Sequence, residues 1–203
     1  MRLFSYIVAY DYGFAPNPFF GVCTLATCKP IIRRTAAIGD WIIGTGSSKN
    51  GKQGYLVYVM HLTEKMTFNE YWKNERFLRK RPNLRGSKKQ AFGDNIYFKD
   101  RLGHWQQQNS HHSNKDGTPY QPNISHDTQT DNVLISTDFA YWGGSGPEIP
   151  QRFRDYNGTD ICKKGPGHKR EFPRKLVDEF IAWFRSLGQI GYQGKPLDWV
   201  GTP

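Results

Sequence analysis

The sequence contains few cysteines. Its 203 residues include three, Cys23, Cys28 and Cys162, an odd number without the paired spacing of metal ligands. This pattern excludes a disulfide framework and a zinc knuckle, and it indicates a reducing compartment. We therefore expect a soluble, cytoplasmic protein with no bound metal and no cofactor.

The sequence also lacks a long hydrophobic run. Its first apolar stretch, residues 3–10, ends at Asp11, and no stretch approaches the ~20 residues needed to cross a bilayer. This stretch predicts a β-strand rather than a signal peptide. We find neither a lipidation signal nor a basic amphipathic helix with a continuous apolar face, so no membrane partner is expected.

Motifs for nucleotide hydrolysis are missing as well. The run Gly44-Thr45-Gly46 lacks the spacing, the lysine and the following helix of a phosphate-binding loop. Thr45 and Ser47 can still offer hydroxyl and backbone N–H groups to a ligand at the end of a predicted strand. We therefore retain both as candidate ligand-binding residues.

Positive charge is abundant. Lys and Arg number 28 against 18 Asp and Glu, which gives a net charge of +10 and a pI of about 9.5. Residues 73–101 hold ten basic against three acidic residues, and residues 151–175 hold eight against three. Such charge favours a nucleic-acid partner, although a solvated basic face is the alternative. The expected phosphate contacts are Arg76, Arg79, Lys80, Arg81, Arg85, Lys88 and Lys89.

The order of periodic segments predicts an α+β fold. Alternating or apolar runs indicate strands over residues 2–10, 22–27, 41–47 and 55–63, the last two forming a hairpin. Thr67 and Glu70 form a capping box that predicts a helix from Phe68 to about Arg79. Apolar residues at helical spacing predict a final helix between Pro173 and Gly188, whereas residues 83–132 are mostly irregular.

The loop at residues 10–20 combines aromatic rings with one carboxylate and one amide. Stacking surfaces and groups aimed at a base edge are what a flipped base requires. The alternative is a rigid aromatic turn that covers the core. The candidate base- or ligand-binding residues, besides Thr45 and Ser47, are Tyr10, Tyr12, Phe14, Asn17, Lys29, Trp41, Asn95 and Trp142.

Acid/base chemistry is best sought near Ser110-His111-His112-Ser113. If the protein is an enzyme, we expect His111 or His112 to act with Asp11, although surface histidines are the alternative. No spacing here completes a deaminase-type zinc site. Cys28 stands beside Lys29, which can activate a thiol. A nucleophile needs a positioned partner that the sequence does not show, so we interpret Cys28 as structural.

Several runs carry a resemblance to known families. Gly39 to Gly44, a polar turn and the strand from Tyr55 to Glu64 resemble PUA-like domains of the EVE, YTH and ASCH groups. A closer similarity is to the second family of nucleotide-modification-associated domains. It rests on Tyr6–Ala9, Asp11–Phe19, Cys23–Pro30, Gly39–Trp41, Gly44–Ser47, Phe68–Trp72, Gly93–Tyr97, Ser110–Ser113 and Val133–Ser136.

This resemblance spans residues 3–145 and implies a fold and a functional context. The fold would be a small, mostly antiparallel β-barrel flanked by helices over residues 1–145. Residues 146–203 would add a basic, Gly- and Pro-rich segment and a C-terminal helix that extends the same domain. The setting would be systems that make or act on modified nucleobases, including phage and anti-phage systems.

Three functions remain open from the sequence. The first is a nucleic-acid-binding module that recognises a modified base, with DNA favoured over RNA as partner. The second is an enzyme acting on a base or nucleotide, such as a glycosidase or a group-transfer enzyme. The third is a structural subunit with protein partners in a modification system.

Overall fold

The computed structural model describes residues 1–199 and divides them into two compact units. The first unit comprises residues 1–11, 36–63 and those from Thr137 onward, and the second comprises residues 12–35 and 64–136. Both units are therefore discontinuous in sequence. The expected division of the chain at residue 145 stays a prediction.

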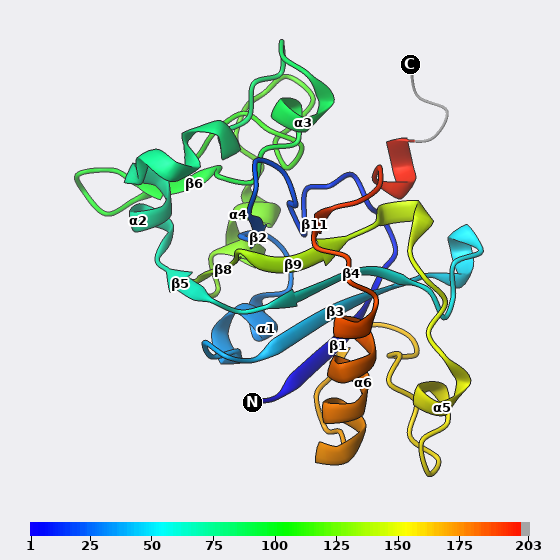
Figure 1. Ribbon diagram of the computed structural model, residues 1–203. Helices are drawn as coiled ribbons and strands as arrows, with labels where there is room; N and C mark the ends of the chain where they lie inside the picture. The colour runs from blue at the N-terminus through cyan, green and yellow to red at the C-terminus, as the bar shows by residue number, and fades with distance from the viewer. Residues whose placement is uncertain (200–203) are drawn as a thin grey trace. The chain divides into compact units, whose positions relative to one another are not determined.

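The first unit is built on a six-stranded sheet (Figure 1). The strand order is β10-β1-β3-β4-β9-β11, in which β1 is parallel to β3, β9 is parallel to β11, and the other neighbours are antiparallel. Its elements are β1 (Leu3–Val8), β3 (Trp41–Gly46), η1 (Ser48–Asn50), β4 (Leu56–His61), β9 (Asp138–Tyr141), η3 (Gly143–Ser145), α5 (Gln151–Arg154), β10 (His168–Lys169), α6 (Arg174–Ser186), β11 (Gly191–Tyr192) and η4 (Leu197–Trp199).

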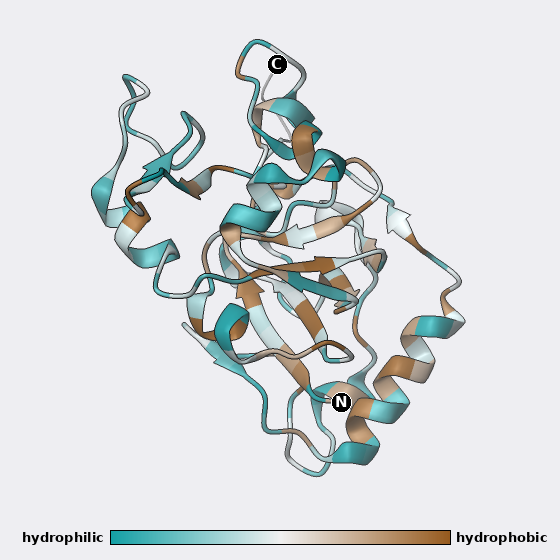
Figure 2. Cartoon of the chain, turned by 90° about the vertical axis from the view of Figure 1, so that its left-hand side faces the viewer, coloured by the Kyte–Doolittle hydropathy of each residue, from teal (hydrophilic) through white to brown (hydrophobic). Residues whose placement is uncertain are grey.

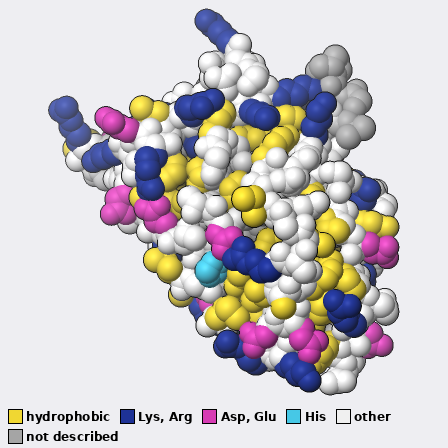
Figure 3. All heavy atoms as spheres, in the orientation of Figure 1, with side chains coloured by type: hydrophobic (Ala, Val, Ile, Leu, Met, Phe, Trp, Pro, Cys, Tyr) yellow, Lys and Arg dark blue, Asp and Glu magenta, His cyan; other side chains and the backbone are white. Residues whose placement is uncertain are grey.

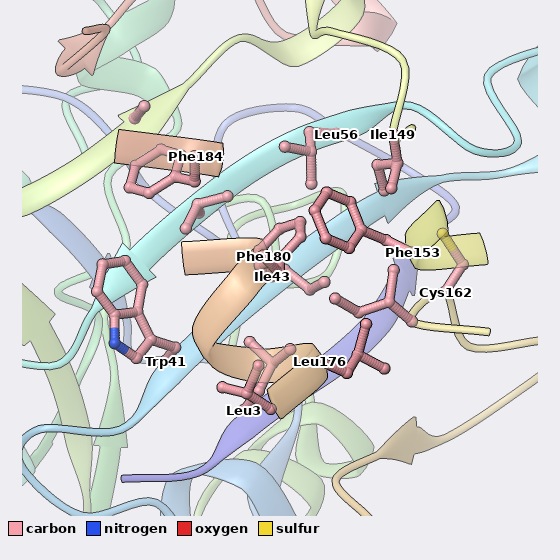
Figure 4. Packing of buried hydrophobic residues seen from close by; sticks show 14 of the residues in the cluster. Leu3, Trp41, Ile43, Leu56, Ile149, Phe153, Cys162, Leu176, Phe180 and Phe184 are labelled. Carbon is pink, nitrogen blue, oxygen red and sulfur yellow. The ribbon is translucent and has the colours of Figure 1, made fainter. Parts of the chain in front are cut away.

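Helix α6 covers part of this sheet through an apolar stripe. Hydrophobic and hydrophilic residues alternate along the helix in Figure 2, and Leu176, Val177, Phe180 and Phe184 are its buried residues. Figure 4 shows Phe180 and Phe184 packed among side chains from the strands, including that of Trp41. This helix confirms the prediction made from the spacing of apolar residues.

The second unit contains two smaller sheets and several short helices. Its three-stranded antiparallel sheet has the order β2-β8-β5, and β6 pairs with β7 in a two-stranded sheet. Its elements are β2 (Cys23–Leu25), α1 (Pro30–Thr35), β5 (Glu64–Met66), α2 (Phe68–Lys73), η2 (Glu75–Lys80), α3 (Lys88–Ala91), β6 (Tyr97–Lys99), β7 (Trp105–Gln107), α4 (Gln121–Asp127) and β8 (Val133–Ser136).

The predicted helix from Phe68 to Arg79 is divided in the structure. The Thr67 and Glu70 capping box is present, but α2 ends at Lys73. Asn74 has an extended conformation, with a ψ of 123°, and its side chain accepts a hydrogen bond from Arg76 N, which caps the 3-10 helix η2. A local capping interaction therefore interrupts a continuous helical pattern.

The structure confirms the α+β class and the hairpin of β3 and β4. The sheets formed by residues 1–199 are open, so they correct the expectation of a small closed barrel. The similarity to PUA-like domains stays a prediction. In the described part of the chain, no helix is both long enough and apolar enough to span a membrane.

Candidate functional site

Cys28 lies in the tight turn between β2 and α1 in the second unit. Its φ of +55° and that of Lys29, +43°, lie in the left-handed region, which is unfavourable for side-chain-bearing residues. Cys28 N donates a hydrogen bond to Asp127 Oδ1 at 2.7 Å, and Arg33 Nε donates to Cys28 O at 2.8 Å. Both hydrogen bonds hold the turn in this conformation.

Arg33 is fully buried and connects segments that are distant in sequence. Its guanidinium also donates to Asn132 O at 3.0 Å and to Asp127 O. Burial lowers the pKa of Arg33 and nearby anionic groups oppose that change, while an arginine stays protonated in either case. The guanidinium thus links the Cys28 turn, the end of α4 and the segment before β8.

Cys28, His112 and Asp127 form a line of three side chains, which we call the triad. His112 Nε2 lies 3.9 Å from Cys28 Sγ, and His112 Nδ1 lies 2.9 Å from Asp127 Oδ2. The His112 backbone is fixed by hydrogen bonds of its N–H to Ser110 Oγ and of Asn123 Nδ2 to its carbonyl. A thiol, an imidazole and a carboxylate in this order are the arrangement that activates a nucleophilic cysteine.

Further hydrogen bonds orient the Asp127 carboxylate. Asp127 is completely buried, and Tyr97 donates its hydroxyl to Asp127 Oδ2 at 2.9 Å. Burial raises the pKa of Tyr97, and the charge of Asp127 adds to the effect, so the tyrosine stays a neutral donor. Gln107 Nε2 donates in turn to the Tyr97 hydroxyl at 3.2 Å. The carboxylate is therefore oriented before any substrate binds.

The two adjacent histidines have opposite electrostatic properties. Burial lowers the pKa of His112, but its hydrogen bonds to Asp127 and Cys28 outweigh burial and raise the pKa to about 9. Burial of part of the His111 ring, together with the charge of His112, lowers the pKa of His111 to about 4, although an edge of the residue is exposed. At neutral pH, His112 is therefore an imidazolium and His111 is neutral.

The raised pKa of His112 predicts a stability that depends on pH. The folded pKa of about 9 exceeds the ordinary histidine pKa of 6.5, so this contribution is fully present below pH 6.5 and is lost as pH rises through 9. The lost free energy of unfolding is expected to be roughly 3 kcal/mol at most. Thermal unfolding of the wild type and of His112→Gln should give a difference that shrinks between pH 6.5 and 9. A constant difference would contradict the prediction.

An aromatic cluster adjoins the triad within the second unit. Tyr12 and Phe92 are stacked with ring centroids 5.4 Å apart, and the His111 ring lies 4.7 Å from Tyr12 and 5.1 Å from Phe92. Phe14 contacts His112 at a centroid distance of 4.5 Å. Residues 12–20 and the histidine loop, both selected from the sequence, therefore do meet.

Asp11 is not a member of this arrangement. It lies in the first unit and is almost fully buried. Its carboxylate accepts hydrogen bonds from the Tyr141 hydroxyl at 2.6 Å and from Leu197 N at 3.1 Å. These hydrogen bonds hold the Asp11 carboxylate within the first unit. The carboxylate of the triad is that of Asp127.

Three aromatic residues proposed as pocket walls also lie in the first unit. Trp41 and Trp142 are 3% and 2% exposed and belong to its hydrophobic core, so neither offers a ring face to a base. Tyr10 is exposed, and Lys49 Nζ donates to its hydroxyl at 2.6 Å. The core positions of the two tryptophans correct the expectation that they line a binding pocket.

Asn17 and Lys80 belong to a buried polar network instead of a binding surface. Lys80 is fully buried, and its ammonium donates to Asn17 O, Asn17 Oδ1, Val22 O and Thr24 Oγ1 at 2.7–3.1 Å. Asn17 Nδ2 donates to Phe92 O at 2.8 Å. An ammonium enclosed in this way cannot reach a phosphate, which corrects the expectation for Lys80.

The other candidate ligand-binding residues lie in different parts of the structure. Asn95 is buried, and its amide donates to two backbone carbonyls, those of Tyr71 and Phe77. Ser47 Oγ accepts the N–H of Lys49 and caps η1. Thr45 lines a cavity in the first unit. Lys29 is half-buried next to Cys28, and burial lowers its pKa.

The remaining basic candidates lie on the second unit. Lys and Arg side chains gather over the surface around η2 and α3 in Figure 3, and Arg79, Arg85 and Lys89 are exposed. Arg76 is exposed too but pairs with Glu64 at 2.8 Å, whereas Arg81 and Lys88 are half-buried. Arg79, Arg85 and Lys89 are thus the ones best placed to meet a phosphate backbone.

The sequence interpretation treated Cys28 as structural and did not identify Asp127 as the partner of His112. The available signal was the Cys28-Lys29-Pro30 run, in which a cysteine precedes a helix. His112 and Asp127 follow Cys28 by 84 and 99 residues, and no local sequence pattern connects residues so far apart. Only folding brings the three side chains together.

The triad holds no metal-ligand cluster, since residues 1–199 contain no group of three or more His, Cys, Asp or Glu side chains arranged for a metal ion.

No curated protein and no solved structure matches the chain. The family described as nucleotide modification associated domain 2 matches residues 1–203, which include the tail beyond residue 145. The chain therefore belongs to the nucleotide modification associated domain 2 family.

Proposed function

We propose that the protein is an enzyme that uses Cys28 as a nucleophile on an acyl group attached to a nucleotide or a nucleic-acid base. The observation that carries this proposal is the triad, in which His112 lies between the Cys28 thiol and the buried Asp127 carboxylate. Membership of a nucleotide-modification family supports the choice of substrate. The reaction class follows from the chemistry of a Cys-His-Asp arrangement.

The proposed reaction has two steps, acylation of Cys28 and release of the acyl group. The Cys28 thiolate attacks the carbonyl carbon, a C–S bond forms, the C–N or C–O bond to the leaving group breaks, and His112 gives its proton to that group. A water or acceptor molecule then loses a proton to His112 and attacks the thioester, which releases the acyl group and restores the thiolate. Asp127 touches no reacting atom and acts as a positioning residue that orients His112.

Features of the second unit support a planar, anionic substrate. Tyr12, Phe92 and His111 present partly exposed rings beside His112, and such rings stack on nucleobases. Arg79, Arg85 and Lys89 supply exposed positive charge on the same unit. We accordingly propose nucleic acid as the partner, DNA before RNA, within a modification or anti-phage system that supplies further protein partners.

A modified-base reader is the second candidate function. The stacked rings of Tyr12 and Phe92 favour it, because a flipped base can be recognised by stacking without a chemical step. In a reader, Cys28 would be dispensable while Tyr12 would not. The two functions therefore differ in which of these residues is required.

The test uses oligonucleotides and nucleotides whose bases carry amide- or ester-linked groups, with matched unmodified controls. Nucleosides are analysed by mass spectrometry after incubation with wild type, Cys28→Ser and Cys162→Ser. We expect a changed nucleoside and an acyl adduct on Cys28 with the wild type and with Cys162→Ser, but neither with Cys28→Ser. Selective binding without turnover, retained in Cys28→Ser and lost in Tyr12→Ala, would favour the reader and contradict the enzyme.

A further inference from the structure

A cavity of about 200 Å³ lies within the first unit, near the end of β3. Four segments contribute to its walls: β1 through Ile7, the end of β3 with the turn after it, the end of α5, and residues 162–165. Ser48 and Gln53 contribute a hydroxyl and an amide group from the turn after β3, and these groups can donate hydrogen bonds to a ligand. The Thr45 hydroxyl donates to Tyr6 O instead.

The lining of this cavity is cationic. Arg154, Lys163 and Lys164 belong to it, whereas no Asp or Glu does. Cys162 also lines the cavity, and burial raises the pKa of this thiol to about 12, so it is neutral at physiological pH. Arg154 is already paired with Asp160, so Lys163 and Lys164 supply the excess positive charge of the cavity walls.

Arg154 is held in place before any ligand arrives. Its guanidinium forms a fork with Asp160, with Nε 2.9 Å and Nη2 3.2 Å from the carboxylate oxygens. Its Nη1 lies against Gly54, where an added Cβ would approach within 2.2 Å. Gly54, with a φ of +88°, therefore leaves room for the guanidinium. A pre-positioned cation loses little conformational entropy on binding.

We propose that this cavity binds the phosphate group of a small phosphorylated molecule, such as a nucleoside monophosphate. Phosphate matches the lining because arginine and lysine donate charge-assisted hydrogen bonds to its oxygens, and hydroxyl groups satisfy the rest. The volume is below the roughly 300 Å³ at which drug-sized pockets begin, which suits a phosphate with part of its sugar. The cavity uses no triad residue.

The test is calorimetric titration with a nucleoside 5′-monophosphate, the same nucleoside without phosphate, and inorganic phosphate. We expect the monophosphate and phosphate to bind and the nucleoside not to bind. The double variant Lys163→Gln/Lys164→Gln should weaken monophosphate binding by roughly tenfold or more, because it removes two charge-assisted contacts. The matched control, Arg170→Gln/Lys175→Gln, removes the same charge elsewhere on the first unit and should change binding less than about twofold.

Three outcomes would overturn the proposal. One is the absence of monophosphate binding to the wild type, and another is equal weakening in both double variants, which indicates net charge alone. The third is binding of a single-stranded oligonucleotide, lost in Lys163→Gln/Lys164→Gln, without binding of the monophosphate. Cys28→Ser should bind the monophosphate as the wild type does, so this test is separate from that of the proposed enzyme.

Discussion

Replacing His112 by glutamine is expected to make Cys28 about 10- to 30-fold less reactive toward iodoacetamide at pH 7, since an isolated thiol is only a few per cent thiolate at that pH. In the wild type, His112 Nε2 lies 3.9 Å from the Cys28 sulfur, where the imidazole can exchange a proton with the thiol. The rate is measured by mass spectrometry of the peptide that contains Cys28, over pH 5.5–9. The rates of the wild type and the variant should differ below pH 9, where His112 is charged.

The adjacent histidine provides a matched control for this measurement. His111→Gln removes an imidazole that is neutral at pH 7 and should change the rate less than about twofold. Cys23 is completely buried and Cys162 is 6% exposed, so both serve as internal references that stay unmodified while the protein is folded. Equal rates in wild type and His112→Gln, or equal losses in both histidine variants, would rule out the triad as the source of reactivity.

Replacing Lys80 by methionine is expected to lower the free energy of unfolding by at least about 1–3 kcal/mol, the range for leaving one buried acceptor without its donor. The change leaves the oxygens of Asn17, Val22 and Thr24 without the ammonium that they share. It also removes a positive charge that acts on the buried Asp94. Burial raises the pKa of Asp94, and Lys80 opposes that rise. Denaturant unfolding followed by circular dichroism measures the loss.

Lys73 offers the matched control for this variant. Lys73 is exposed at the end of α2, so Lys73→Met should change stability by less than about 0.5 kcal/mol. In the double variant Lys80→Met/Asp94→Asn, removal of the orphaned charge should recover part of the loss. A loss below about 1 kcal/mol for Lys80→Met would show that Lys80 is not a structural cation.

The most predictable elements were those with strong local signals. Helix α6 follows from apolar residues at helical spacing, and the β3 and β4 hairpin from two apolar runs around a polar turn. The capping box at Thr67 fixed the start of α2. The predicted end of that helix was wrong because the Asn74 side chain accepts a hydrogen bond from Arg76 N and caps η2. This local interaction competes with continuation of the helix.

The candidate site was predictable only in part. The Ser110–Ser113 loop and the aromatic run from Tyr12 were selected because polar and aromatic groups crowd there, and the structure does bring His111 and His112 against Tyr12 and Phe14. Asp11, one residue before this run, is occupied within the first unit instead. Position in a loop therefore did not reveal which carboxylate would serve a histidine.

The sequence by itself determined the α+β class, the family and the basic character of the chain, because composition and short motifs depend on neighbouring residues alone. Tertiary structure decided the roles of individual charges. Lys80 lies in a run of basic residues and yet is fully buried, whereas Arg79 beside it is exposed. It also decided the triad, since Cys28 and Asp127 are 99 residues apart and meet only when Arg33 and Tyr97 hold their segments together.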